Sequence, residues 1–212
     1  VYGLPELHRD ALKGAGAIAA PGCYPTAATL ALRPLMDAGL IESTGIIVDA
    51  MSGVSGAGRP PKPTTTFCAV DSDVQAYGLL DHRHTSEMDM NLGATVLFTP
   101  HLVPMSRGIL ATCYARPAVD GLSTATLMEV LIDRYEDEPF VVASERSPST
   151  KATLGTNAAH VTARYDERTG TVLALAAIDN LGKGASGQAM QCMNLALGLP
   201  ETQGLAVVGT TP

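Results

Sequence analysis

Cys23 is the residue whose local sequence points most directly to chemistry. It lies in Gly22-Cys23-Tyr24-Pro25-Thr26, between residues 18–20, expected to end a short buried strand, and a helix predicted from residue 26. Pro25 is typical of a first helical turn, where its missing N–H is not needed. A thiol at that point faces unpaired N–H groups and the positive end of the helix dipole, which both favour the thiolate. We therefore expect a nucleophile with a pKa below about 8.5, although a small core cysteine is the alternative.

Two histidines follow in Asp81-His82-Arg83-His84-Thr85-Ser86-Glu87. Residues two apart on an extended segment point to the same side. A cysteine nucleophile needs an acid or base that is near in space, and His84 is the first candidate and His82 the second. A polar surface loop is one alternative. A metal site that includes His101 and His160 is another, but their spacing matches no known metal motif, so we predict no metal.

Three further segments have residue types that bind anions or nucleotides. In Ser52-Gly53-Val54-Ser55-Gly56-Ala57-Gly58-Arg59, glycines permit close backbone approach and Arg59 adds charge, but the P-loop ending is missing. Arg107 follows Pro104-Met105-Ser106 in a predicted turn, and arginine binds carboxylate or phosphate bidentately. The segment 179–187 places Asn180 and several glycines, Gly184 among them, before a predicted helix. Taken alone, each of these signals also fits an ordinary loop or turn.

Composition excludes several classes of function. The chain has 212 residues, of which 46% are hydrophobic and 17% charged, so it can bury a core and is not disordered. A net charge of −7 and 4% aromatic residues argue against nucleic-acid binding. No apolar run reaches the length of a membrane span, so we expect no membrane partner. The four cysteines show no CxxC spacing, which indicates a reducing compartment, and we infer the cytoplasm.

The hydrophobic pattern predicts an α+β fold with a mixed, largely antiparallel sheet and helices packed on one face. Most strands fall in the second half, and residues 166–170 form a clear hairpin turn between two of them. The predicted helices span residues 26–39, 85–92, 123–137 and 184–197. The predicted strands span residues 46–51, 95–103, 108–116, 140–142, 159–165 and 171–178.

These motifs, in this order, resemble those of the N-acetyl-gamma-glutamyl-phosphate reductases of arginine biosynthesis, which are related to aspartate-semialdehyde dehydrogenase and glyceraldehyde-3-phosphate dehydrogenase. The likeness runs from Tyr2 to Val208, and the cysteine and histidine motifs are its most specific parts. The resemblance implies a C-terminal domain like that of glyceraldehyde-3-phosphate dehydrogenase. It also implies an oxidoreductase that converts N-acetyl-gamma-glutamyl phosphate to N-acetylglutamate semialdehyde with NADPH, through a Cys23 thioester.

The resemblance also assigns roles to the candidate residues. His84, or His82, protonates the oxyanion and holds the thiolate as an ion pair, and Glu87 orients the imidazole. Arg107 and Arg59 hold the substrate's phosphate or carboxylate, next to Ser52 and Gly53. Asn180 and Gly184 contact the nicotinamide end of NADP(H).

The resemblance further implies that this chain lacks most of the nucleotide-binding domain, because no GxGxxG follows an initial strand. We expect residues 1–22 to be a remnant of that domain and residues 23–180 to be the catalytic and oligomerisation domain. Residues 181–212 would form a helix and tail that pack on the nucleotide-binding domain. The partners implied are a small acyl phosphate and further copies of the chain, as a homodimer or homotetramer. The chain alone is expected to be inactive. A Cys-His acyl hydrolase and a noncatalytic dimerisation module remain alternatives.

Overall fold

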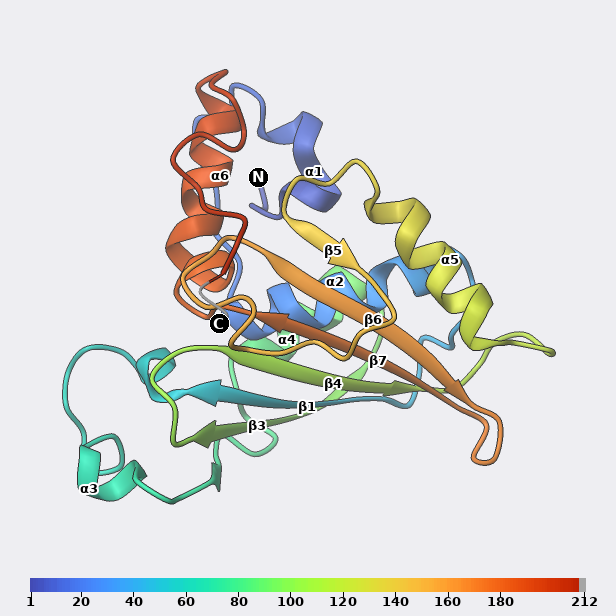
Figure 1. Cartoon of the computed structure of the whole chain (residues 1–212), viewed down its shortest axis with the longest axis horizontal. Coiled ribbons are helices and arrows are strands. Elements are labelled where there is room, and N and C mark those ends of the chain that lie inside the picture. The colour runs from blue at the N-terminus through green and yellow to red at the C-terminus, as the bar shows by residue number, and fades with distance from the viewer. Residues whose placement is uncertain (210–212) are drawn as a thin grey trace.

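A computed structural model describes residues 1–209, whose centre is one mixed sheet in the order β2-β3-β1-β4-β7-β6-β5 (Figure 1). The pairs β1–β3 and β5–β6 are parallel and the other pairs are antiparallel, as predicted for a largely antiparallel α+β domain. The strands are β1 (Ile46–Gly53), β2 (Gln75–Ala76), β3 (Val96–Val103), β4 (Ile109–Ala115), β5 (Val141–Ala143), β6 (Ala159–Asp166) and β7 (Thr171–Ile178).

Helices cover one face of this sheet. α2 packs on β4, β6 and β7, α5 packs on β5 and β6, and α4 packs on β3. In Figure 1, α2 and α4 lie behind the strands. The helices are α1 (Pro5–Leu12), α2 (Cys23–Asp37), α3 (Phe67–Val70), α4 (His84–Leu92), α5 (Thr124–Tyr135) and α6 (Gly187–Ala196), with a 3₁₀ turn η1 (Val54–Ala57) and a π-helical turn η2 (Gly182–Ser186).

Alternation along the strands explains why one face is covered and the other is not. In β1, the side chains of Ile46, Val48 and Ala50 are buried, whereas Ile47 and Met51 are exposed. Successive strand residues point to opposite faces, so the first set packs under the helices and the second lies on the uncovered face. The same alternation in β3 and β4 builds the core that fixes the start of α2.

Helix α2 contains a proline, Pro34, near its C-terminal end, and the fold compensates for it. Pro34 has no N–H to give to the carbonyl of Leu30, one turn earlier. The hydroxyl of Tyr135, at the end of α5, donates a hydrogen bond of 2.7 Å to that same oxygen. The buried carbonyl therefore has a partner, and the contact joins α2 to α5.

The structure corrects the sequence analysis near the N-terminus. Residues 18–20 are not a buried strand: Ala19 forms one isolated bridge with Tyr2, and both Ala19 and Ala20 are exposed. Helix α1, with Pro5 at its first position, was not predicted, nor were the short elements α3, β2 and η1. The predicted helix 184–197 is a π-helical turn followed by α6.

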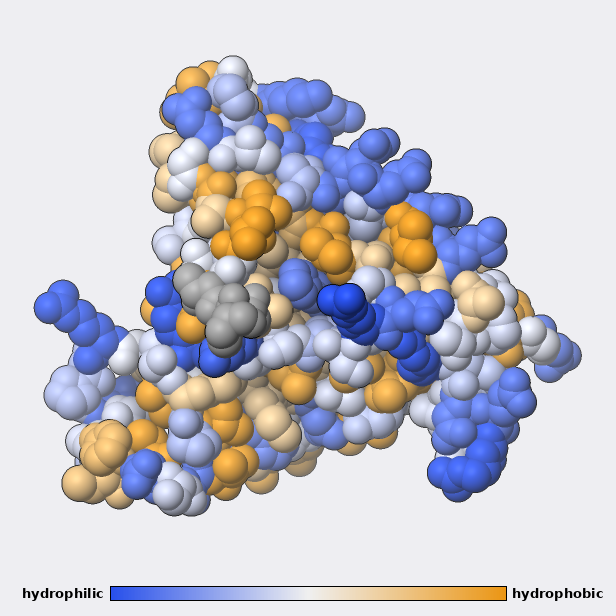
Figure 2. Space-filling model, in the orientation of Figure 1, coloured by the Kyte–Doolittle hydropathy of each residue, from blue (hydrophilic) through white to orange (hydrophobic). Residues whose placement is uncertain are grey.

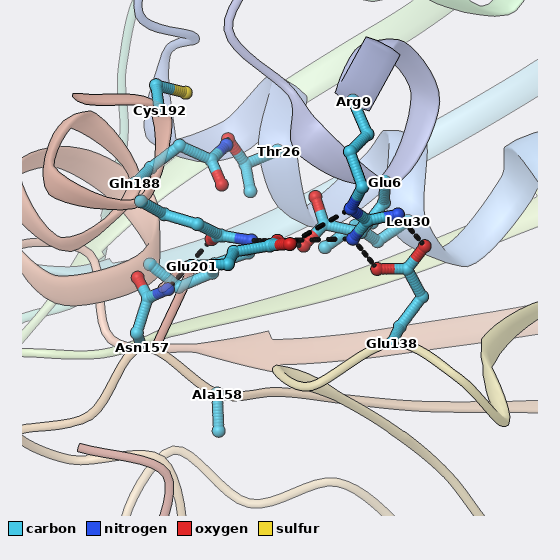
Figure 3. A network of polar contacts seen from close by, with 12 residues as sticks. Glu6, Arg9, Thr26, Leu30, Glu138, Asn157, Ala158, Gln188, Cys192 and Glu201 are labelled. Atoms are coloured by element: carbon cyan, nitrogen blue, oxygen red, sulfur yellow. Dashed lines mark hydrogen bonds and ion pairs between the residues drawn. The ribbon is translucent and has the colours of Figure 1, made fainter. Parts of the chain in front are cut away.

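A buried polar network ties the N-terminal segment to the C-terminal elements (Figure 3). Lys183, which is 0% exposed, donates to the carboxylate of Glu6 and, over 2.7 Å, to the side-chain oxygen of Gln191. Arg9 forms ion pairs with Glu138 and Glu201 in the same network. The network therefore connects α1, η2, α6, the segment before β5 and the segment after α6.

Replacement of one partner of the buried Glu6–Lys183 pair should destabilise the fold strongly. In Lys183→Met, Glu6 keeps a buried charge without its counter-ion, which costs about 3–5 kcal/mol in the free energy of unfolding. Urea unfolding followed by circular dichroism measures this loss.

The double variant Glu6→Gln with Lys183→Met removes both charges and should regain most of the lost stability. Lys13→Met breaks the exposed pair with Asp10 and should leave the urea midpoint unchanged. A double variant as unstable as Lys183→Met would show that the methionine side chain, and not the unpaired carboxylate, causes the loss.

Candidate active site

A cavity of about 440 Å³ lies at the start of α2, beneath the loop that follows β1. Its size is typical of small-molecule sites. The cavity brings the predicted cysteine and both predicted histidines together with the glycine-rich segment. Its lining residues are Cys23, Tyr24, Ser52, Gly56, Ala57, Lys62, Thr64, Thr65, Gln75, Ala76, Tyr77, His82, Arg83, His84 and Leu102.

Cys23 is the first residue of α2, as the sequence pattern suggested, and glycines allow its close surroundings. A Cβ added at Gly184 would lie 2.8 Å from the Cβ of Cys23. A Cβ added at Gly22 would lie 2.5 Å from Nε2 of His84. Both positions therefore require glycine. Gly184 lets η2 approach Cys23, and Gly22 lets the His84 imidazole approach the turn before the cysteine.

The pKa of the Cys23 thiol is raised, contrary to the expectation from its helix position. Burial is the main cause, since it disfavours the charged thiolate. The backbone N–H groups of Tyr24 and Cys23 and the charge of Arg83 act in the opposite direction, but they do not outweigh burial. At neutral pH the resting residue is a thiol, and it needs a base to become a nucleophile.

His84 is suited to be that base. Burial, with the nearby charges of His82 and Arg83, lowers the pKa of His84 to about 4, so the imidazole is neutral at neutral pH. Both pKa shifts disfavour the predicted resting ion pair between His84 and a Cys23 thiolate. His82 lies against His84 with ring centroids 4.8 Å apart, and its Nδ1 accepts a hydrogen bond of 3.1 Å from the His84 backbone N–H. His82 therefore helps to fix the position of His84.

Glu87 does not contact either imidazole through a hydrogen bond, which corrects its predicted orienting role. Its Oε1 accepts hydrogen bonds from the Tyr2 hydroxyl, at 2.6 Å, and from the Gly22 backbone N–H, at 2.8 Å. Within residues 1–209, Nδ1 of His84 is buried without a hydrogen-bond partner. Glu87 thus holds the turn that carries Cys23.

The predicted arginines do not line the cavity. Arg107 forms a two-point ion pair with the buried Asp179, with distances of 3.1 and 2.9 Å. Arg59 is exposed on the loop after η1. Gly53 packs against the backbone of Arg107, where an added Cβ would lie 2.7 Å from the nearest atom, whereas Ser52 lines the cavity directly.

Asn180 is buried behind the glycine-rich segment. Its Oδ1 accepts a hydrogen bond of 2.7 Å from the Gly108 backbone N–H, and its Nδ2 donates to the Ser55 hydroxyl over 3.0 Å. The side chain therefore joins two loops at the edge of the site.

Several polar lining residues were not singled out from the sequence, namely Lys62, Thr64, Thr65, Gln75, Tyr77 and Arg83. Tyr77 donates a hydrogen bond of 3.0 Å to the Tyr24 hydroxyl. Arg83 lies between the two predicted histidines, so its charge next to them was the available signal. Lys62 lies in the proline-rich loop, which gave no such signal.

A model of the semialdehyde dehydrogenase dimerisation domain matches residues 23–180 of this chain. The chain belongs to the semialdehyde dehydrogenase family. It is 52% identical to the N-acetyl-gamma-glutamyl-phosphate reductase of Desulforudis audaxviator over 100% of this chain and 63% of that protein. It is 48% identical to the Moorella thermoacetica reductase, again over 63% of the relative's length. The chain therefore spans less than two thirds of these curated relatives.

Solved structures show the same fold. Aspartate semialdehyde dehydrogenase II of Vibrio cholerae, complexed with ASA, has a TM-score of 0.68 and 20% identity, and the match covers 92% of this chain and 67% of that one. Aspartate semialdehyde dehydrogenase of Francisella tularensis has a TM-score of 0.70 and 12% identity, with coverage of 92% and 70%. These matches confirm the predicted fold class, an α+β domain with a mixed sheet.

Two further observations concern the part of the domain that the structure describes. Residues 1–209 contain no group of three or more histidine, cysteine, aspartate or glutamate side chains placed to hold a metal ion. None of the helices in that range has the length and apolarity that crossing a bilayer requires.

The raised pKa of Cys23 predicts the pH dependence of its alkylation. Its reaction rate with iodoacetamide, followed by peptide mapping, should keep rising with pH beyond the point where N-acetylcysteine levels off, because burial delays thiolate formation. An inflection below that of N-acetylcysteine would mean that the helix start outweighs burial.

Proposed function

We propose that this chain carries the acyl-transfer site of an N-acetyl-gamma-glutamyl-phosphate reductase of arginine biosynthesis. The observation that carries this proposal is the placement of a partly buried thiol, Cys23, in one cavity with the neutral imidazole of His84. The reductase names of the relatives, at 48–52% identity, give the substrate. The free cysteines of residues 1–209 agree with the predicted cytoplasmic location.

In the first step, His84 accepts the thiol proton while the sulfur of Cys23 attacks the acyl carbon of the substrate. The C–S bond forms and the C–O bond to phosphate breaks, so inorganic phosphate leaves and a thioester remains. Backbone N–H groups at the start of α2 stabilise negative charge on sulfur before the bond forms. The proton is then held on His84 as an imidazolium.

For the second step, bound NADP(H) would supply the hydride that reduces the thioester, while Cys23 holds the acyl carbon. His84 returns its proton as the aldehyde is released, and the thiol is restored. Asn180 and Gly184 remain the proposed contacts with the nicotinamide end of the cofactor, since Gly184 lies against Cys23 and Asn180 joins the two loops beside it. We infer that residues outside this chain bind most of NADP(H), and that the chain alone does not complete turnover.

We keep the predicted division of the chain as part of the proposal. Residues 23–180 form the catalytic and oligomerisation unit, and residues 1–22 and 181–212 adjoin the nucleotide-binding domain. Residues 210–212 lie outside the described part of the chain. The polar network that joins α1 to α6 supports the pairing of the two flanking segments.

Acylation of Cys23 tests the proposed chemistry without the cofactor. Intact-mass spectrometry of the chain with N-acetyl-gamma-glutamyl phosphate should show one N-acetylglutamyl adduct per chain, which persists when NADPH is added. His84→Gln should slow its formation by roughly 10²–10⁴-fold, the usual contribution of a general base.

Cys23→Ser should form no thioester, whereas Cys68→Ser, which removes an exposed thiol, should behave as the unchanged chain. An adduct that survives in Cys23→Ser would overturn the mechanism. Continued release of phosphate beyond one equivalent would instead indicate an acyl hydrolase.

The uncovered sheet face is the proposed contact between copies of this chain. It presents Met51 and Leu97, which are 47% and 50% exposed. Figure 2 shows apolar residues among polar ones over β1, β3 and β4. The dimerisation domain named by the family model supports this face as the interface.

The chain should therefore be a homodimer or homotetramer by light scattering at micromolar concentration. Leu97→Asp places a charge in the apolar contact and should shift the chain to a monomer. Val119→Asp, on the loop between β4 and α5, is the matched control and should leave the mass unchanged. A monomeric unchanged chain would contradict the proposed interface.

A further inference from the structure

The cavity beside Cys23 is lined by two cations and by no carboxylate, although the charges of Glu87 and Asp81 act on Cys23 and His82 from outside the lining. Its lining includes Lys62 and Arg83 but no aspartate or glutamate. Neither of these two cations has a side-chain hydrogen bond or ion pair within residues 1–209, whereas most other cationic side chains do. A cavity of this kind favours an anionic ligand.

The two cations occupy different parts of the cavity. Arg83 lies between His82 and His84 in sequence, and its charge acts on Cys23 and on both imidazoles. Lys62 comes from the loop after η1, in a turn where its backbone N–H donates to the Thr65 hydroxyl over 3.0 Å. Thr64 and Thr65 line the cavity beside it, so hydroxyl donors accompany the lysine.

The predicted anion binder Arg107 does not line this cavity. Its guanidinium already binds both carboxylate oxygens of the buried Asp179. Release of Arg107 toward a substrate would leave Asp179 buried and unpaired, which is strongly unfavourable. Asp179 also accepts hydrogen bonds from the backbone N–H groups of Gly155, Leu181 and Gly182, so it is fixed in place.

We propose that Lys62 and Arg83 form a two-anion subsite, in which Arg83 binds the phosphoryl group beside Cys23 and Lys62 binds the carboxylate at the far end of the substrate. This inference rests on the proposed function for the identity of the two anions. The phosphoryl group is joined through one oxygen to the carbon that sulfur attacks, so it must lie near Cys23 and hence near Arg83. Arginine also matches phosphate geometry with two parallel N–H donors. The carboxylate is several bonds away, where the lysine of the outer loop can reach it.

Alkylation with two reagents of different charge tests this subsite without substrate turnover. Iodoacetate and iodoacetamide modify the same thiol, but only iodoacetate is attracted by local positive charge. The ratio of their rates at Cys23, relative to the ratio for N-acetylcysteine, reports the field at the sulfur. Because both reagents act on the same variant, the ratio cancels changes in thiol exposure and pKa.

Arg83→Gln should lower this ratio by roughly two- to fivefold at low salt, as expected for one charge within several ångströms of a partly solvated thiol. Lys62→Gln should lower it less, since Arg83 but not Lys62 is among the charges that act on the Cys23 thiol. Arg168→Gln is the matched control: it removes one charge from the exposed β6–β7 hairpin and should leave the ratio unchanged. An equal effect of all three would mean that net charge alone, and not a subsite, determines the ratio.

Protection experiments separate the two positions. Inorganic phosphate should slow the alkylation of Cys23 by iodoacetamide in the unchanged chain and in Lys62→Gln, but not in Arg83→Gln. N-acetylglutamate should also protect Cys23 in the unchanged chain, and this protection should be lost mainly in Lys62→Gln. Protection that persists in both variants would overturn the subsite, whereas failure of acylation with intact protection would count only against the proposed reaction.

Discussion

The start of α2 is held from three sides, and this confinement determines the environment of Cys23. Glu87 accepts a hydrogen bond from the Gly22 backbone N–H, Gly184 of η2 packs against Cys23, and His84 packs against Gly22. Each contact removes water from the sulfur. Desolvation favours the thiol over the thiolate by more than the helix dipole and the local N–H groups favour the reverse. Desolvation also keeps His84 neutral. Burial therefore favours the protonated form of Cys23 and the unprotonated form of His84 at the same time.

The confinement depends on parts of the chain far from the cavity. Lys183 adjoins Gly184 in η2, and its buried ion pair with Glu6 ties η2 to α1. Tyr2, ahead of α1, donates to the same Glu87 oxygen that receives the Gly22 N–H. The N-terminal segment therefore reaches both sides of the cysteine turn. A disturbance of the buried pair should move the site even though neither residue lines it.

Patterns within single elements could be predicted from the sequence, because they are local. Apolar periodicity located α5, β6 and β7, and the glycine-cysteine-aromatic-proline motif placed Cys23 at a helix start. Burial cannot be read in this way, since it depends on which segments meet. The direction of the Cys23 pKa, the pairing of Arg107 with Asp179 and the attachment of Glu87 to Gly22 all arise from contacts across 65 or more residues. Helix α1 was missed because Leu4-Pro5-Glu6 begins like a turn, and its helix is only eight residues long.

The arrangement of charge gives the cavity a further property. Its nucleophile and its base are both uncharged at rest, while its unpaired charges are cations. An anionic acyl phosphate, the substrate proposed above, would be attracted by groups that do not take part in proton transfer. Its negative charge would favour protonation of His84 and raise the affinity of the imidazole for the thiol proton. In the proposed reaction, substrate binding would therefore increase the basicity of His84 when Cys23 must lose its proton, and departure of phosphate would reverse the effect.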